Sequence, residues 1–173
     1  MTTRRVYKGA MIEVVTEDVS LPNGRTVPLD LVRHPGAAAV VPFLGDDEIL
    51  LIRQYRFAVG GEILEVPAGK LDPGETPTEC AARELEEETG WRPGRLEHLA
   101  TILTTPGFTN ERIHLFAAFE LEAGRQDLQH DEMIEVVPMP IDAALDAIWR
   151  GELPDAKSAL ALVHAARRIG RLR

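Results

Sequence analysis

Three glutamates on one predicted helix, Glu84, Glu87 and Glu88, are the residues of this chain best suited to chemistry. Their i, i+3 and i+4 spacing places them on one narrow arc at about 100° per residue. Like charges on successive turns repel each other, and partial burial would favour protonation. A divalent cation removes this conflict, because Mg²⁺ and Mn²⁺ prefer hard oxygen ligands. For the carboxylates alone, an ordinary solvated face remains the better interpretation by roughly two to one.

Capping signals predict where this helix begins and ends. Thr76 is a suitable N-cap, Pro77 occupies the first helical position, and Glu79 completes a capping box three residues after the cap. Gly90 can adopt the left-handed conformation that ends many helices. We therefore expect a short, rigid helix that holds its carboxylates at fixed separations.

A spaced pattern that includes this helix favours the metal-binding interpretation. It consists of Gly69, five residues, Glu75, seven residues, Arg83-Glu84-Leu85, one residue, Glu87-Glu88, one residue and Gly90. A chance match is below roughly one in ten million per start point, since each residue type makes up about 6% of an average protein. The pattern resembles the signature box of the Nudix hydrolases. The last box position is usually aliphatic, and here it is Trp91.

The resemblance implies a metal site with two or more Mg²⁺ or Mn²⁺ ions. Glu84 and Glu88 correspond to the principal ligands, and Glu87 adds a ligand or a bridge. The backbone carbonyl of Ala68 would complete the set.

Other box residues are implied to position these ligands. Arg83 would orient the carboxylates through a salt bridge, and Glu75 would brace the loop through hydrogen bonds. Gly69 would allow the tight bend that packs the loop over the helix, and Gly90 would end the helix.

The segment after the box resembles the ADP-ribose pyrophosphatase branch of that family. Pro106 lies sixteen residues after Gly90 and is followed by Gly107 and Phe108. Members of that branch have a proline at this offset from the box. The resemblance implies that this loop contacts the substrate. It also implies that Arg56, with Arg53 nearby, pairs with a substrate phosphate, although a solvated arginine at a strand end is equally compatible with the sequence. GDP-mannose pyrophosphatases share much of this layout.

The catalytic base is not settled by the resemblance. Relatives place a glutamate where this chain has His130, two residues before Glu132. His130 has a suitable reference pKa of about 6.5, but a loop histidine is more often a bystander. Glu132, as metal ligand or base, is the better candidate. Glu111 in the proline loop and a metal-bound hydroxide that needs little help are further alternatives.

Composition limits the classes of partner. The net charge of −9 argues against a nucleic-acid surface, and it would repel a phosphate substrate unless metal ions intervene. The single Cys80 cannot form an internal disulfide, which suits a reducing compartment. The start of the sequence lacks an apolar stretch typical of a signal peptide or membrane span. We expect a cytoplasmic protein with no membrane partner.

The order of predicted strands and helices favours a mixed α/β protein. Residues 1–36 are predicted to form a small β-hairpin unit from the runs Met11–Val19 and Thr26–Arg33, and residues 37–173 the main domain. In the main domain, Ala37–Leu44 and Glu48–Tyr55 suggest a second hairpin. Further predicted elements are the strands Glu62–Val66, Leu96–Thr104, Ile113–Leu121 and Ile134–Val137, and the helices Ile141–Arg150 and 156–169 with Asp155 as N-cap.

The resemblance implies a Nudix-type α/β/α sandwich in which helices enclose a mixed sheet. It implies that the N-terminal unit pairs across a homodimer and contributes to the substrate pocket. The expected activity is metal-dependent hydrolysis of ADP-ribose to AMP and ribose 5-phosphate. Two alternatives remain: the same chemistry on GDP-mannose or another nucleoside diphosphate derivative, and a non-hydrolytic module that senses nucleotides.

Overall fold

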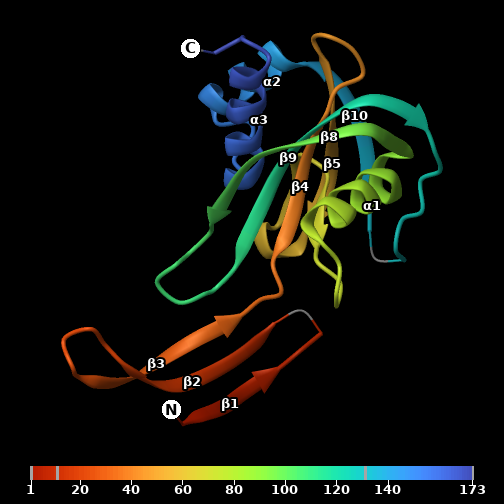
Figure 1. Ribbon diagram of the computed structural model, residues 1–173. Coiled ribbons are helices and arrows are strands. Elements are labelled where there is room, and N and C mark those ends of the chain that lie inside the picture. The colour runs from red at the N-terminus through yellow and green to blue at the C-terminus, as the bar shows by residue number, and fades with distance from the viewer. Residues whose placement is uncertain (1, 11, 131, 173) are drawn as a thin grey trace.

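The computed structural model describes residues 2–10, 12–130 and 132–172, which form three sheets and three α-helices (Figure 1). Met11, at the start of one predicted strand, and Asp131 lie outside the described residues. The elements are β1 (Thr3–Lys8), β2 (Glu13–Ser20), β3 (Thr26–Arg33), β4 (Ala37–Pro42), β5 (Glu48–Arg56), the 3₁₀ turn η1 (Phe57–Val59), β6 (Gly61–Glu65), β7 (Ala68–Lys70), α1 (Pro77–Thr89), β8 (Trp91–Leu103), β9 (Arg112–Ala123), β10 (Ile134–Pro140), α2 (Ile141–Arg150) and α3 (Ala156–Arg168).

A four-stranded sheet of order β7-β4-β9-β8 forms the middle layer of the main domain. It is mixed, because β4 and β9 run parallel while the other neighbours are antiparallel. Both faces of β4 are buried: Ala38 and Val40 pack with α1, whereas Ala39 and Val41 pack with α2 and α3. Figure 1 shows α1 on one side of this sheet and α2 and α3 on the other. The predicted α/β/α sandwich is confirmed.

The predicted hairpin between residues 37–44 and 48–55 is wrong. Both strands exist, but β5 belongs to a separate three-stranded sheet of order β10-β5-β6. Among the described residues, the two strands pair only next to the turn, through an isolated β-bridge between Phe43 and Ile49. The reason is that β4 already has hydrogen-bonded neighbours on both edges, β7 and β9, so no edge remains for β5.

Strand β10 continues past the predicted end at Val137, through Pro138 to Pro140. Prolines are tolerated there because β10 is an edge strand that pairs only with β5. Strand β8 likewise begins at Trp91, five residues before the predicted start at Leu96. The two C-terminal helices have the predicted positions, and the Asp155 side chain caps α3 by accepting a hydrogen bond from the Ser158 N–H.

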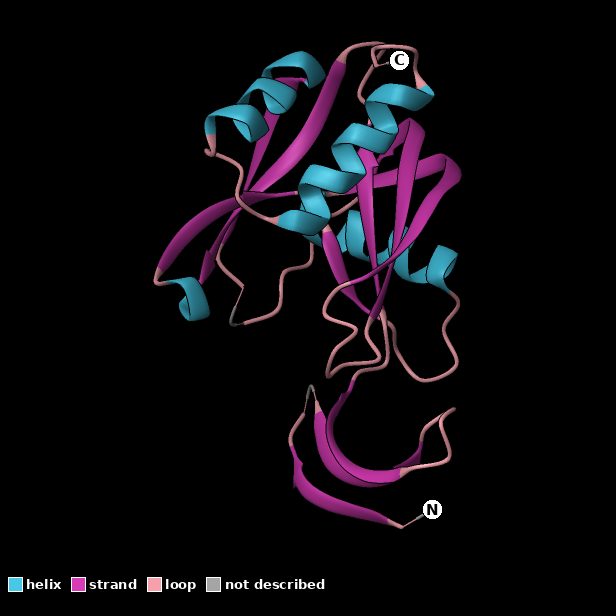
Figure 2. Cartoon of the chain, turned by 90° about the vertical axis from the view of Figure 1, so that its left-hand side faces the viewer, coloured by secondary structure: helices cyan, strands magenta, loops and turns pink. Residues whose placement is uncertain are grey.

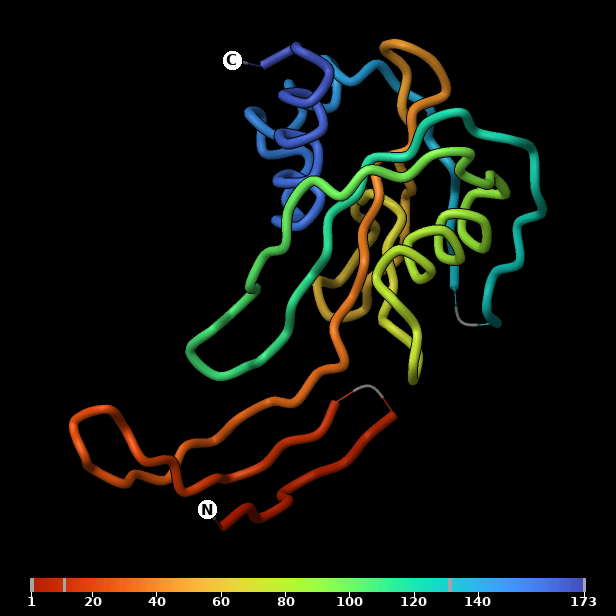
Figure 3. Tube along the Cα trace, in the orientation of Figure 1, coloured from red at the N-terminus to blue at the C-terminus, as the bar shows by residue number. Residues whose placement is uncertain are grey.

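The N-terminal unit is a three-stranded antiparallel sheet, β1-β2-β3. The predicted hairpin is present as β2 and β3, and β1 is an additional strand. This sheet is largely exposed and lies beyond one end of the main domain in Figures 2 and 3. It is held to the β8–β9 loop where the Val32 N–H donates to the Phe108 carbonyl at 2.7 Å. The division at residue 36 stays a prediction.

Among the described residues, no helix is both long and apolar enough to cross a membrane.

Candidate active site

Helix α1 has the predicted caps. Thr76 accepts a hydrogen bond from the Glu79 N–H, while the Glu79 carboxylate accepts from the Thr76 N–H, so the capping box is complete. Gly90 has a left-handed conformation with φ of 77° and ends the helix. Cys80 is buried in the core beneath α1, and burial raises the pKa of its thiol to about 12. Cys80 is therefore a packing residue of this core.

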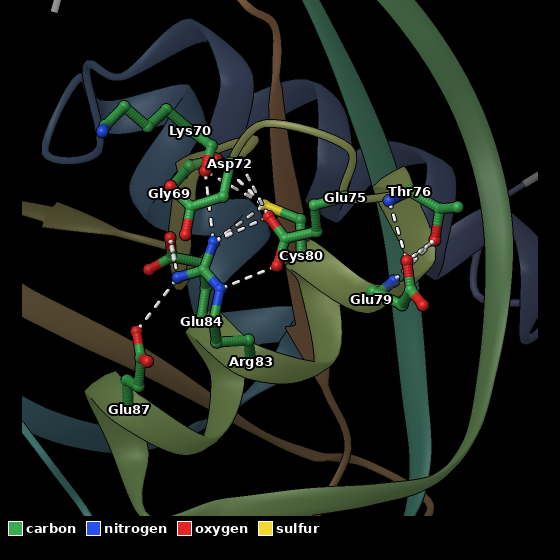
Figure 4. Close-up of polar contacts among 10 residues, drawn as sticks. All are labelled: Gly69, Lys70, Asp72, Glu75, Thr76, Glu79, Cys80, Arg83, Glu84 and Glu87. Atoms are coloured by element: carbon green, nitrogen blue, oxygen red, sulfur yellow. Dashed lines mark hydrogen bonds and ion pairs between the residues drawn. The ribbon is translucent and has the colours of Figure 1, made fainter.

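Arg83 lies at the centre of a group of carboxylates (Figure 4). Its Nε is 2.7 Å from Oε1 of Glu75, and its Nη1 lies 2.7 Å from Glu84 and 3.0 Å from Glu87. Nη2 also donates to the Lys70 carbonyl, which ties the preceding loop to the helix. We call Glu75, Arg83, Glu84, Glu87 and Glu88 the α1 cluster. The salt bridges anticipated for Arg83 are therefore present in the structure.

The loop before α1 approaches the carboxylates closely. A Cβ atom on Gly69 would lie 1.9 Å from Oε1 of Glu84, so a side chain at this position would collide with the carboxylate. The neighbouring Ala68 N–H donates to Oε2 of Glu88 at 2.9 Å. Glu75 accepts from the Asp72 N–H at 2.9 Å and so braces the loop. Gly69 lies within the extended strand β7 and not in the predicted tight bend; a glycine is required there because a side chain would not fit against Glu84.

The carboxylates of the α1 cluster differ in the direction of their pKa shifts. Hydrogen bonds from Arg83 lower the pKa of Glu75 to about 2. Burial raises the pKa of Glu84, although Arg83 partly offsets the effect. Burial, together with the charge of Glu84, raises the pKa of Glu88 to about 8. Glu88 is 2% exposed, and within the described residues it has no ion-pair partner. Two buried carboxylates are therefore held side by side with incomplete charge compensation.

A cavity of about 440 Å³ opens over these carboxylates. Its lining includes Glu84 and Glu88 from α1, Arg56 at the end of β5, and Glu132 before β10. Glu132 also accepts a hydrogen bond from the Gln129 N–H at 2.8 Å. The cavity thus brings together predicted residues that are up to 76 positions apart in the sequence.

The donor set of this cavity fits a hard divalent cation, since it offers carboxylate oxygens with uncompensated negative charge. Among the described residues, however, no three His, Cys, Asp or Glu side chains converge closely enough to form a ready-made metal site. The contacts explain this: Arg83 engages Glu84 and Glu87, and Glu88 turns toward the Ala68 N–H. The ligand assignments for Ala68, Glu84, Glu87 and Glu88 stay predictions.

The other predicted residues are divided between the cavity and remote positions. Arg56 lines the cavity and forms two hydrogen bonds to Glu65, at 3.0 and 2.7 Å. Arg53 lies on the opposite side of β5 and pairs with Glu135 at 3.4 Å. His130 is exposed and does not line the cavity, and its neighbour Asp131 is not described.

The proline loop is not part of this cavity in the same chain. Pro106 lines a different pocket, near His34. Glu111 accepts from the Thr104 hydroxyl at 2.7 Å and lies 3.4 Å from His34, away from the carboxylates of α1. Phe108 is half exposed and contacts the N-terminal sheet through its carbonyl. Pro106, Gly107, Phe108 and Glu111 therefore stay predicted site residues that the single chain does not bring to the cavity.

Sequence reasoning assigned no role to Gln54, which also lines the cavity. Gln54 is 6% exposed, and its Oε1 has no hydrogen-bond partner among the described residues. A buried amide oxygen without a partner is costly, so Gln54 is a residue of the cavity wall whose hydrogen bonding is incomplete. The sequence did contain a signal for this residue. Gln54 lies two positions from Ile52 and from Arg56, so it continues the inward-facing positions of a buried strand.

Comparisons with known proteins agree with this geometry. A family model described as the NUDIX domain matches residues 32–161. An ADP-ribose pyrophosphatase of Bacillus subtilis is 39% identical over 160 residues, covering 91% of this chain and 86% of that protein. A methanol dehydrogenase activator of Bacillus methanolicus is 38% identical over 162 residues, covering 92% and 88%.

A solved structure described as an ADP compounds hydrolase shares the fold. It superimposes with a TM-score of 0.84 at 23% identity, covering 99% of this chain and 95% of that one. The family model spans well over half of the chain, including helix α1 with the spaced glutamates and the segment at Gly69. This chain therefore belongs to the Nudix family.

Proposed function

We propose that this chain is a metal-dependent hydrolase that cleaves the diphosphate bond of ADP-ribose to AMP and ribose 5-phosphate. The observation that carries the proposal is the presence of a cation and excess carboxylates in one cavity, which is lined by Arg56 and by the buried Glu84 and Glu88. Similarity over nearly the whole chain to an ADP-ribose pyrophosphatase supports the choice of substrate.

The charge of the substrate explains the arrangement. A diphosphate carries about two negative charges, and attack by water adds charge on the leaving phosphate. Bound Mg²⁺ or Mn²⁺ would neutralise this charge and lower the pKa of water. In this chain, Glu84, Glu87 and Glu88, with the carbonyl of Ala68, are proposed to hold the ions. We propose two or more ions, because a single ion would leave several of these oxygen donors unused.

The remaining cavity residues are proposed to bind and orient the substrate. Arg56 pairs with a phosphate oxygen, for which a planar guanidinium is well suited. Glu132 lines the cavity and is the preferred base or additional metal ligand. Arg83 and Glu75 act at a distance by holding the carboxylates in place. His130 and Glu111 stay alternatives for the base.

The proline loop and the N-terminal unit are proposed to act across a homodimer. The three-stranded sheet of residues 2–33 is largely exposed, and the loop carrying Phe108 is attached to it. Pairing of two such units would cover this surface and offer Pro106, Gly107, Phe108 and Arg53 to the substrate of one or other subunit. Size-exclusion chromatography with light scattering tests the dimer, and a monomer at micromolar concentration contradicts it.

A metal-dependent assay on a panel of nucleoside diphosphate sugars tests the proposed activity. We expect AMP and ribose 5-phosphate from ADP-ribose with Mg²⁺ or Mn²⁺ and no turnover with EDTA. The second candidate is GDP-mannose, because further relatives are named GDP-mannose pyrophosphatase. Turnover of GDP-mannose with ADP-ribose left intact would reverse the choice of substrate.

The variant Glu87→Gln tests whether the chain is an enzyme or a nucleotide-sensing module. Glu87 is partly exposed and lines a neighbouring pocket that shares Arg83 with the cavity, so the change should spare folding but remove turnover. An unchanged rate would contradict the proposed metal role of Glu87. Ligand binding without turnover by the wild-type chain, across the whole panel, would favour the non-hydrolytic module.

A further inference from the structure

A second group of charges surrounds Arg56, outside the α1 cluster. Glu65, at the end of β6, is buried with 3% of its side chain exposed. It accepts two hydrogen bonds from Arg56 and one from Lys157 of α3, whose Nζ is 2.9 Å from Oε2. Lys157 also lies 2.8 Å from Asp155. We call Arg56, Glu65, Asp155 and Lys157 the α3 cluster.

The position of Lys157 is unfavourable without Glu65. It is the second residue of α3, where the partial positive charge of a helix N-terminus repels a cation. Asp155 caps the same helix end and accepts hydrogen bonds from the N–H and the hydroxyl of Ser158, so its charge is already compensated in part by the helix. A buried carboxylate 92 residues away in the sequence is thus the partner that makes a lysine acceptable here.

The balance of charge decides what Arg56 can do. Without Lys157, the two carboxylates of Glu65 and Asp155 would outnumber Arg56 and leave one net negative charge, which opposes a phosphate. With Lys157 as a second cation, the α3 cluster is neutral, and no excess carboxylate cancels the charge of Arg56. Arg56 is the member that lines the cavity, and its side chain is 39% exposed, whereas that of Lys157 is 16% exposed.

We propose that Lys157 is a positioning residue: it neutralises Glu65 and so leaves the charge of Arg56 available to a substrate phosphate. This inference rests on the proposed function for the role of Arg56. Glu65 fixes the plane of the guanidinium through two hydrogen bonds, and Lys157 prevents that same carboxylate from cancelling the charge. A residue on the last helix thereby tunes substrate binding without touching the substrate.

The same helix end also anchors the loop that leads to the carboxylates. The Ser158 hydroxyl accepts a hydrogen bond from the Val66 N–H at 2.9 Å, and both residues are buried. Ser158 would keep this contact when Lys157 is changed, so the charge of Lys157 can be removed while the attachment of α3 is retained.

The test is a set of variants at Lys157 measured in two ways. Lys157→Met should raise KM for ADP-ribose by roughly tenfold with little change in kcat, since paired charges in one network commonly couple by this amount. It should weaken binding of ADP, measured by calorimetry in EDTA, by a similar factor. Lys157→Arg should restore both values, because it keeps the charge.

Two combinations exclude a merely structural effect. In Glu65→Gln/Lys157→Met, one carboxylate and one cation are removed together, so the remaining charges of Arg56 and Asp155 again sum to zero and KM should return toward the wild-type value. In Arg56→Gln/Lys157→Met, KM should equal that of Arg56→Gln alone, because Lys157 acts only through Arg56. Arg150→Met, which breaks an exposed ion pair at the end of α2, is the matched control and should change neither KM nor ADP binding.

The outcomes distinguish this inference from the proposed function. If wild-type protein hydrolyses ADP-ribose but Lys157→Met leaves KM and ADP affinity unchanged, the inference is overturned and the function stands. Effects that multiply in the double variant with Arg56→Gln overturn it as well. If wild-type protein leaves ADP-ribose intact while Lys157→Met weakens ADP binding, the function fails and the inference stands. If the wild-type protein shows neither hydrolysis of ADP-ribose nor binding of ADP, both the proposed function and the inference are overturned.

Discussion

The α1 cluster and the α3 cluster are both built from carboxylates and cations, but in different proportions: four carboxylates to one cation in the first and two to two in the second. Around Arg83, one guanidinium contacts three carboxylates, and Glu88 is left with a backbone N–H. Around Glu65, one buried carboxylate contacts two cations, and Asp155 is shared with a helix N-terminus. Both groups border the same stretch of chain, residues 65–70, but only the second is close to neutral.

The difference shows which cluster is complete within the protein. A neutral network such as the α3 cluster can be satisfied by its own side chains, so its glutamate keeps a pKa below the ordinary value despite burial. The α1 cluster has more negative charge than its arginine compensates, and burial raises the pKa of Glu84 and Glu88. Such an excess of charge is stable only when protons or cations supply the balance.

The largest expected effect is that of removing one charge from each cluster. Glu88→Gln should lower kcat by about a thousandfold, the size expected for several kcal/mol of lost charge stabilisation, yet raise Tm in EDTA by about 3 °C. Glu65→Gln should instead lower stability by about 2 kcal/mol, because it leaves two partly buried cations without their carboxylate. Thermal unfolding and steady-state kinetics measure both. A loss of stability in Glu88→Gln would contradict the comparison.

The pH dependence of stability should have opposite signs for the two clusters. In EDTA, the folded state keeps a proton on Glu88 between its unfolded pKa of 4.5 and its folded pKa of about 8. Raising the pH through this window should therefore lower Tm, on the order of 5 °C. Glu88→Gln should remove the slope and Mg²⁺ should reverse it. A flat profile in the wild type would show that Glu88 is not held protonated.

For the α3 cluster, the pH range in which stability changes lies below pH 4.5. Burial alone would raise the pKa of Glu65, but Arg56 and Lys157 hold it below 4.5. Its stabilising effect is therefore present above pH 4.5 and is lost as the pH falls through the folded pKa. The difference in stability between wild type and Glu65→Gln should shrink as the pH falls below 4.5.

A smaller effect is expected from the cap of α3, which also belongs to its cluster. Asp155→Ala removes both the hydrogen bond to the Ser158 N–H and the charge beside Lys157. We expect a loss of about 1–2 kcal/mol by denaturant unfolding. Asp155→Asn keeps a capping side chain and should recover more than half of this loss. Equal losses in the two variants would show that charge, and not capping, is the dominant contribution.

The smallest effect is expected from the cap of α1. Thr76 and Glu79 form a capping box that lies outside the α1 cluster. Thr76→Ala should lower stability by about 1 kcal/mol, and kcat should stay within twofold because the carboxylates keep their positions. A large fall in kcat without unfolding would show that the helix start and the carboxylates are coupled.

Part of the fold and of the site could be predicted from the sequence. The caps of α1, the bounds of α2 and the hairpin of β2 and β3 agree with prediction because each depends on residues a few positions apart. The convergence of Arg83 on Glu75, Glu84 and Glu87 follows from the same spacing that resembles the family box. The strand pairing of β4 could not be predicted, since its partners lie up to 76 residues away along the chain.

By itself, the sequence determined the local elements, the spacing of the carboxylates and membership of the family. Only the tertiary structure decided that β5 leaves the sheet of β4, that the proline loop lies away from the cavity, and that Lys157 meets Glu65 across 92 residues. The physical reason is that short-range hydrogen bonds are encoded in neighbouring residues, whereas charge balance and burial are properties of segments that meet only when the core forms.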